Sequence, residues 1–137
     1  MITLSEYFGS WIDHPDATPE RQANAVRLLA AENALQKRME SDGVIFHTNP
    51  KTGCTISGSR FGGFRPQDCP IGAPHSAHKE GFSIDKYDPY NEIDVWVLDH
   101  PEALEEFGIY IEHPSTTPNW SHWSLRAPPS GHHIFYP

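Results

Sequence analysis

Pro74-His75-Ser76-Ala77-His78-Lys79-Glu80-Gly81-Phe82-Ser83-Ile84-Asp85 is the stretch on which the predicted fold and site depend. Its pattern predicts a loop that carries His78, a turn at Gly81 and a short strand that carries Asp85. Side chains alternate along a strand, so Phe82 and Ile84 share one face while Asp85 lies on the other. The apolar face can enter a core, which leaves Asp85 facing a cleft beside His78. An imidazole nitrogen and a carboxylate oxygen together suit zinc.

A third ligand is expected further along the chain, and His122 in Asn119-Trp120-Ser121-His122-Trp123-Ser124 is the candidate. In a strand, Trp120, His122 and Ser124 share one face, so His122 can point the same way as Asp85. The sequence therefore predicts a mononuclear zinc site made of His78, Asp85 and His122.

Composition limits the class of protein. The 137 residues fit a single domain, 1–137, and 37% hydrophobic with 20% charged residues is typical of a globular chain. A formal net charge of -8 argues against nucleic-acid and anionic-membrane partners, which are bound through Lys and Arg. No apolar run is long enough to span a bilayer, and the first residues lack the pattern of a secretion signal. We therefore expect synthesis and folding in a cytoplasm, with Cys54 and Cys69 as reduced thiols.

The N-terminal part, residues 1–43, is predicted to be helical. Thr3 and Glu6 have the spacing of a capping box around one or two helical turns. Thr18-Pro19-Glu20 then predicts the start of a long helix that ends at Asp42-Gly43. Its apolar residues recur with helical spacing and predict a packing face: Ala25, Leu28, Leu29, Ala31, Leu35 and Met39.

The remainder alternates between short strands, helices and irregular segments. A long Gly/Pro-rich loop over 58–74 is expected to be functional, since such loops are rarely accidental in a small domain. Residues 109–113 and 120–125 are expected to form an antiparallel pair. The other predicted elements are strands at 44–46, 54–57, 82–86 and 133–136, a helix through residue 97 that Asn91 caps, and a helix from Pro101 that Gly108 ends.

The motifs together are recognisable. Ser76-x-His78-x-x-Gly81-x-Ser83-x-Asp85, followed by Trp120-x-His122, resembles the SxHxxGxAxD and late WxH motifs of a zinc peptidase family. That family contains D-alanyl-D-alanine carboxypeptidases, VanX-type D,D-dipeptidases and phage L-alanyl-D-glutamate endolysins. Gly63-Phe64-Arg65-Pro66 is similar to the family's GYRP segment. The resemblance covers roughly residues 54–137, the expected metal-site core, and residues 109–137 look most like small bacteriophage proteins of this group.

The resemblance implies an α+β fold, with a small antiparallel sheet and helices packed on it, and a zinc ion bound by His78, Asp85 and His122. It implies hydrolysis of a peptide bond in the peptidoglycan stem by zinc-activated water. Arg65 would stabilise an oxyanion or bind a substrate carboxylate, with Arg60 as second choice and Ser76 as a further substrate-binding candidate. Without a signal, the protein would reach the cell wall by phage-assisted release or as part of a virion, with virion components as partners.

One position departs from the family pattern. Active members carry Glu or Asp three residues before the last histidine, whereas this chain has Asn119, an amide that cannot accept the proton. Glu112 on the preceding strand is the replacement candidate, and Glu80, His113 and His75 are the alternatives. Two other interpretations stay open: a zinc-bearing but catalytically degenerate phage structural or cell-wall-binding module, and a globular protein whose histidines are incidental.

Overall fold

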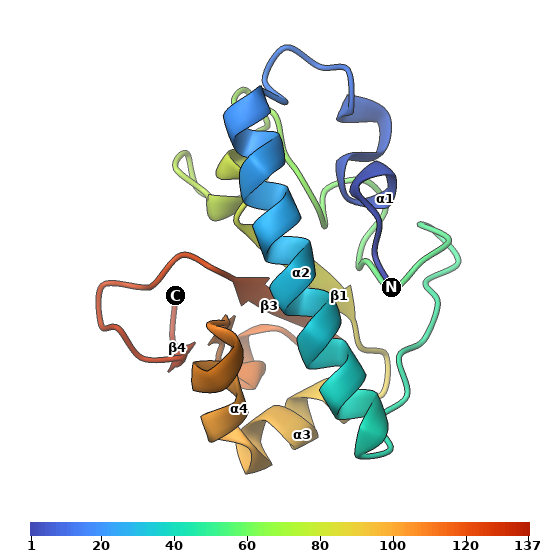
Figure 1. The fold of residues 1–137 in the computed structure, drawn as a ribbon, viewed down its shortest axis with the longest axis vertical. Helices are drawn as coiled ribbons and strands as arrows, with labels where there is room; N and C mark the ends of the chain where they lie inside the picture. Colours follow the sequence, from blue (N-terminus) through green and yellow to red (C-terminus); the bar gives the residue numbers. More distant parts are fainter.

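Helix α2 (Pro19–Ser41) is the longest element and crosses one face of a four-stranded sheet (Figure 1). The computed structural model describes residues 1–137. As predicted, Thr18 caps the helix, with its Oγ1 accepting a hydrogen bond from the backbone N–H of Arg21 at 3.2 Å. The predicted packing face is confirmed, because Ala25, Leu28, Leu29, Leu35 and Met39 are all buried. Its three buried polar residues, Asn24, Glu32 and Gln36, were not predicted.

The sheet has the order β1-β3-β2-β4, with strands β1 (Ser83–Tyr87), β3 (Trp120–Ser124), β2 (Tyr110–Glu112) and β4 (Ile134–Phe135). Strand β3 pairs antiparallel with β2, as predicted, and also pairs antiparallel with β1. The prediction of an antiparallel sheet is wrong in one respect, since β4 runs parallel to β2. Because β1 already occupies the other edge of β3, the chain returning after β3 pairs with the free edge of β2. The fold is therefore α+β with a mixed sheet.

The remaining helices are short: α1 (Leu4–Phe8), α3 (Glu92–Asp99), α4 (Pro101–Phe107), and the 3₁₀ turns η1 (Gly9–Trp11), η2 (Ala77–Glu80) and η3 (Pro114–Thr116). The capping box of Thr3 and Glu6 is present at α1. Gly108 ends α4 as predicted. None of the helices combines the length and the apolar character needed to cross a bilayer.

Helix α3 is capped by a residue other than the one predicted. Asn91 precedes the helix in a left-handed conformation, and its side chain makes no capping bond. Instead the carboxylate of Asp88 accepts hydrogen bonds from the backbone N–H groups of Ile93 and Asp94, both at 3.2 Å. Asn91 Oδ1 accepts from the N–H of Asn119 at 3.2 Å and so ties this helix to the start of β3.

The two strands predicted over 44–46 and 54–57 do not form. This region makes only isolated bridges, Asn49 with Cys54 and Ile56 with Lys86. The side-chain amide of Asn49 donates to the carbonyls of Ile56 and Gly58 at 3.0 and 2.8 Å, where a regular strand would use a neighbouring backbone. Both cysteines, Cys54 and Cys69, are free and buried.

The core lies between α2 and the sheet, and strand alternation decides which side chains enter it. Ile84 on β1 and its register partner Trp123 on β3 are fully buried. The neighbouring partners Asp85 and His122 therefore lie on the opposite face, away from α2. That second face carries the candidate site.

Candidate metal centre

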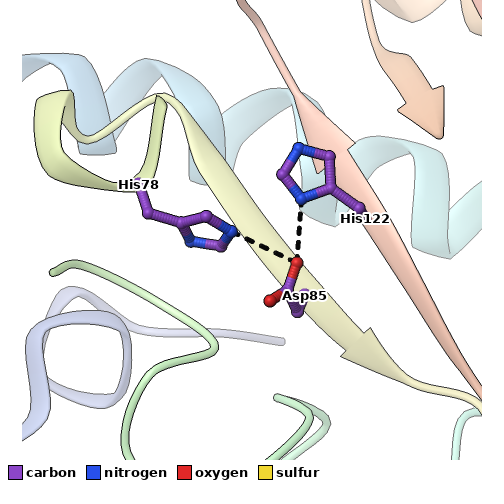
Figure 2. Close-up of side chains that lie close together, drawn as sticks. All are labelled: His78, Asp85 and His122. Carbon is purple, nitrogen blue, oxygen red and sulfur yellow. Dashed lines mark hydrogen bonds and ion pairs between the residues drawn. The ribbon is translucent and has the colours of Figure 1, made fainter. Parts of the chain in front are cut away.

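Three side chains converge on the sheet face opposite α2 (Figure 2). Asp85 Oδ1 lies 3.2 Å from His78 Nε2 and 2.9 Å from His122 Nδ1. The three ligand atoms all lie within 4.8 Å of one another, and both histidine rings point toward the carboxylate. The structure thus brings together the three residues predicted from the sequence, in a group that could hold a metal ion.

Two of these residues are positioned by the sheet. Asp85 and His122 are register partners on the antiparallel strands β1 and β3, so their side chains leave the same face side by side. Asp85 is 7% exposed, and its backbone N–H donates to the carbonyl of Gly62 at 2.7 Å.

His78 comes from the 3₁₀ turn η2, which is fixed at both ends. Ser76 Oγ accepts a hydrogen bond from the backbone N–H of His78 at 3.3 Å. Gly81 ends the turn with a φ of +79°, which glycine adopts without strain. A Cβ at Gly81 would also lie 2.5 Å from the carbonyl oxygen of Arg21 on α2. The glycine spacing between His78 and Asp85 therefore serves both the turn and its contact with the long helix.

The backbone carbonyls of Gly62 and Gly63 contact two of the candidate metal ligands, Asp85 and His78. Gly62 accepts from the N–H of Asp85, and the carbonyl of Gly63 lies 2.8 Å from His78 Nδ1. A Cβ at Gly63 would lie 2.2 Å from the carbonyl oxygen of Tyr7, so only glycine fits against α1. This role was not predicted from the sequence, although Gly63 begins the Gly63-Phe64-Arg65-Pro66 segment.

The hydrogen bond to Gly63 decides which nitrogen of His78 carries a proton. A carbonyl can only accept, so Nδ1 donates. His78 is only 2% exposed. Its burial lowers the pKa of the ring and therefore favours the neutral form. Its Nε2 then presents a lone pair to Asp85 Oδ1 at 3.2 Å. Two electron-rich atoms repel at this distance unless a proton or another cation lies between them, and a metal ion would be such a cation.

Asp85 stays ionised in this setting. Burial acts to raise its pKa, but the positive charge and hydrogen bonds that His78 and His122 offer when protonated outweigh burial and hold the pKa of Asp85 well below its usual range. Its second oxygen, Oδ2, accepts a hydrogen bond from Arg65 Nη2 at 3.2 Å. One carboxylate oxygen thus faces the histidines and the other is held by Arg65.

A cavity of about 790 Å³ opens over the three residues. It lies within the range of small-molecule sites. The long loop 58–74, β1, β2, β3 and the segment after β3 all contribute to its wall. The acidic, basic and histidine side chains that line it are those of Arg65, His78, Asp85, Glu112, His122 and Arg126.

Glu112 is the carboxylate that the fold adds to this cavity. Tyr110 pairs with Ser124 across β2 and β3, so continuing that register places Glu112 opposite His122. Burial raises the pKa of Glu112, and the nearby His122 partly offsets this effect. The side chain makes no ion pair within 4 Å, so it remains available to a ligand in the cavity.

Asn119 and the other predicted proton carriers lie elsewhere. Asn119 occupies the turn before β3 with a φ of +66° and does not line the cavity. Glu80 pairs with Arg21 at 3.4 Å. The ring of His113 hydrogen-bonds Ser115, and neither His113 nor His75 lines the cavity.

The two predicted substrate-binding residues differ in their placement. Ser76 lines the cavity, although its hydroxyl also caps η2. Arg60 lies outside the cavity wall, with its guanidinium 5.3 Å from the ring centroids of both Trp11 and Phe61. Arg126, which was not predicted as a site residue, lines the cavity beyond β3. The pattern of the sequence gave no signal for it, because its position depends on the turn after Ser124.

Comparison of the chain with protein-family models, with curated proteins and with solved structures gives no match.

Proposed function

We propose that this protein is a zinc-dependent peptidase that hydrolyses a peptide bond in peptidoglycan stem peptides. The observation that carries the proposal is the convergence of His78, Asp85 and His122 at the base of a cavity. Two imidazoles and one carboxylate are a common ligand set of catalytic zinc. Tetrahedral ligands about 2.0–2.2 Å from zinc lie roughly 3.3–3.6 Å apart. The contacts of 3.2 and 2.9 Å at Asp85 Oδ1 need little adjustment to reach that spacing.

Three protein ligands leave a fourth position toward the cavity. A zinc ion bound there would supply a water of lowered pKa and would polarise a substrate carbonyl. Glu112, on the strand next to His122, is the proposed general base that accepts the proton of the attacking water. Arg65 lies on the cavity wall and donates a hydrogen bond to Asp85 Oδ2, so it would orient this carboxylate as a ligand of the ion.

The substrate class is proposed from the motifs. Ser76-x-His78-x-x-Gly81-x-Ser83-x-Asp85 and Trp120-x-His122 resemble those of peptidases that act on D-amino-acid-containing stem peptides. The chain would then act on the cell wall, released with phage assistance or carried in a virion. The bonds to be tested are those of D-alanyl-D-alanine and L-alanyl-D-glutamate.

The test combines metal analysis with cleavage. Purified protein is expected to hold one zinc per chain and to release fragments from purified peptidoglycan or stem peptides. His78→Ala should lose both zinc and cleavage, whereas Glu112→Gln should keep zinc and lower kcat by about 10²–10⁴-fold. Full activity in Glu112→Gln would overturn the assignment of the base. Protein without stoichiometric zinc after loading would overturn the whole proposal.

A second function is favoured by one observation. The position of the family's usual base is Asn119, which sits in a left-handed turn outside the cavity. If Glu112 does not replace it, the protein is a zinc-bearing, catalytically degenerate cell-wall-binding or phage structural module. Zinc-loaded protein that binds peptidoglycan in a sedimentation assay without cleaving it would identify this function.

A further inference from the structure

We propose that Arg126 is the residue that binds a carboxylate of the substrate, and that Arg65 is a positioning residue for Asp85. The inference rests on the proposed peptidase function and adds to it a specificity determinant. It assigns to the cavity a class of ligand: peptides with a free carboxylate close to the bond at the metal centre.

The guanidinium group of Arg65 is already hydrogen-bonded to other groups of the protein. Each of its three nitrogens donates a hydrogen bond: Nε to the carbonyl of Phe61 at 2.7 Å, Nη1 to Ile71 at 3.4 Å and Nη2 to Asp85 Oδ2 at 3.2 Å. The loop also packs closely against it, because a Cβ at Gly72 would lie 2.5 Å from Nη1. The residue is 8% exposed and its charge is balanced by Asp85. Turning toward a substrate carboxylate would break these bonds and release a metal ligand.

Arg126 is anchored but not neutralised. Its backbone N–H donates to Ser124 Oγ at 3.0 Å, and its Nη2 donates to the carbonyl of His75 at 2.8 Å. These two contacts join the end of β3 to the loop that precedes η2, so they hold the guanidinium between the segments that carry His122 and His78. No carboxylate lies within 4 Å of Arg126. Its remaining N–H groups are free to form the paired hydrogen bonds that guanidinium makes with carboxylate.

The charges of the cavity make Arg126 distinctive. Among the side chains that line the cavity, the permanent cations are Arg65 and Arg126, and the carboxylates are Asp85 and Glu112. Arg65 and Asp85 neutralise each other, which leaves Arg126 as the unpaired cation of the wall. An anionic group of a ligand would be attracted there and repelled from Glu112. This polarity would give a peptide one favoured direction through the site.

The short distance in sequence between His122 and Arg126 limits how far from the metal centre the substrate carboxylate can lie. Arg126 follows His122 by four residues, which span at most about 13–14 Å in an extended chain. A peptide substrate extends at most about 3.3–3.6 Å per residue. The recognised carboxylate would therefore belong to a residue within about four of the bond at the metal centre. Both a C-terminal D-alanine and the side chain or α-carboxylate of D-glutamate satisfy this condition.

The experiment measures binding by zinc-loaded full-length protein, so it gives a result whether or not cleavage follows. The probes are N-acetyl-L-lysyl-D-alanyl-D-alanine with its C-terminal amide, and L-alanyl-D-glutamate with L-alanyl-D-glutamine amide, in which both carboxylates of the D-glutamate are replaced by amides. Affinities are measured by calorimetry for the wild type, Arg126→Gln, Arg126→Lys and the control Lys37→Gln. Lys37 is an exposed residue of α2 away from the cavity. Lys37→Gln removes one positive charge, as Arg126→Gln does, and is therefore the matched control.

The wild type should bind one carboxylate form about 10–100-fold more tightly than its amide, since a charge-assisted hydrogen bond is lost in the amide. Arg126→Gln should lose this preference while keeping stoichiometric zinc, Arg126→Lys should retain part of it, and Lys37→Gln all of it. The peptide pair that shows the preference identifies the source of the carboxylate. Arg65→Gln should instead lower zinc affinity, by about 10–100-fold as for other residues that orient a ligand.

Two results would overturn the inference. One is an unchanged carboxylate preference in Arg126→Gln, and the other is a wild type that binds the acids and amides equally. Failure of the proposed peptidase function looks different. In that case the wild type would still bind the peptides and discriminate between them, but it would cleave none.

Discussion

Asp85 and His122 face each other directly across β1 and β3, and Asp85 Oδ1 lies 2.9 Å from His122 Nδ1. Pairing of the two strands therefore fixes two of the three candidate metal ligands. The third, His78, depends on the four-residue turn η2 and on Gly81 at its end. Changes in that turn should affect metal binding more than they affect the sheet.

Gly81→Ala tests the turn. Alanine disfavours a φ of +79°, and its Cβ would meet the carbonyl oxygen of Arg21 at 2.5 Å. We expect a loss of about 1–3 kcal/mol in the free energy of unfolding, together with weaker zinc binding, because the turn that carries His78 must move. Urea denaturation and zinc titration measure the two effects. The matched control is Gly108→Ala, which has a φ of +70° but no atom within 4 Å of the new Cβ. It should cost only the backbone strain and leave zinc affinity unchanged; equal effects of both variants on zinc affinity would contradict the prediction.

Metal removal should destabilise the protein. Without a cation, the lone pair of His78 Nε2 faces Asp85 Oδ1 at 3.2 Å. Zinc at a free concentration of 100 times its Kd should add about 2.7 kcal/mol to the stability of the folded state, and chelation should remove that gain. Thermal unfolding with zinc and with chelator measures the difference, which should vanish in His78→Ala and persist in His132→Ala, a change at an exposed histidine outside the site. A melting temperature that zinc leaves unchanged in the wild type would contradict a metal centre here.

A buried ion pair lies on the other face of β1. Lys86 is fully buried and its Nζ contacts Glu32 on α2, with further hydrogen bonds to Gln36 Oε1 at 2.9 Å and Thr55 Oγ1 at 3.0 Å. Removing one partner leaves an uncompensated buried charge, so Lys86→Met should cost about 3–5 kcal/mol. The double variant Lys86→Met with Glu32→Leu should recover most of that loss, because no charge then remains buried. Urea denaturation of the two variants checks this; a double variant less stable than Lys86→Met would contradict it.

Asp94 should make stability depend on pH. Burial, and then the nearby Asp88, raise the pKa of Asp94 to about 7, and its Oδ1 is buried without a hydrogen-bond partner. The folded protein therefore binds a proton that the unfolded chain has already lost, and stability falls as pH rises from about 4, the usual Asp pKa, to about 7. We expect Asp94→Asn to be more stable than the wild type at pH 8 by on the order of 1–2 kcal/mol, a value reduced for solvent screening. At pH 5 the difference should be smaller. Denaturation curves at both pH values test this, and identical pH dependence in the two proteins would count against it.

The local elements could be predicted because their causes are local. Thr18-Pro19 starts α2 through a cap and a fixed proline φ, and the Gly81 spacing sets a turn between His78 and Asp85. The same local logic failed at residue 91, where Asp88 competes successfully for the N–H groups of α3, and at 54–57, where the Asn49 amide takes up the carbonyls.

By itself, the sequence determined the start and end of α2, the faces of β1 and β3 and the identity of three side chains suited to one ion, because periodicity and ligand chemistry are properties of neighbouring residues. Only the tertiary structure decided that β4 runs parallel to β2, that Glu112 and Arg126 share the cavity, and that Lys86 meets Glu32. These relationships join segments far apart in the chain. They depend on which sheet edge is free and on strand register, which no local pattern encodes.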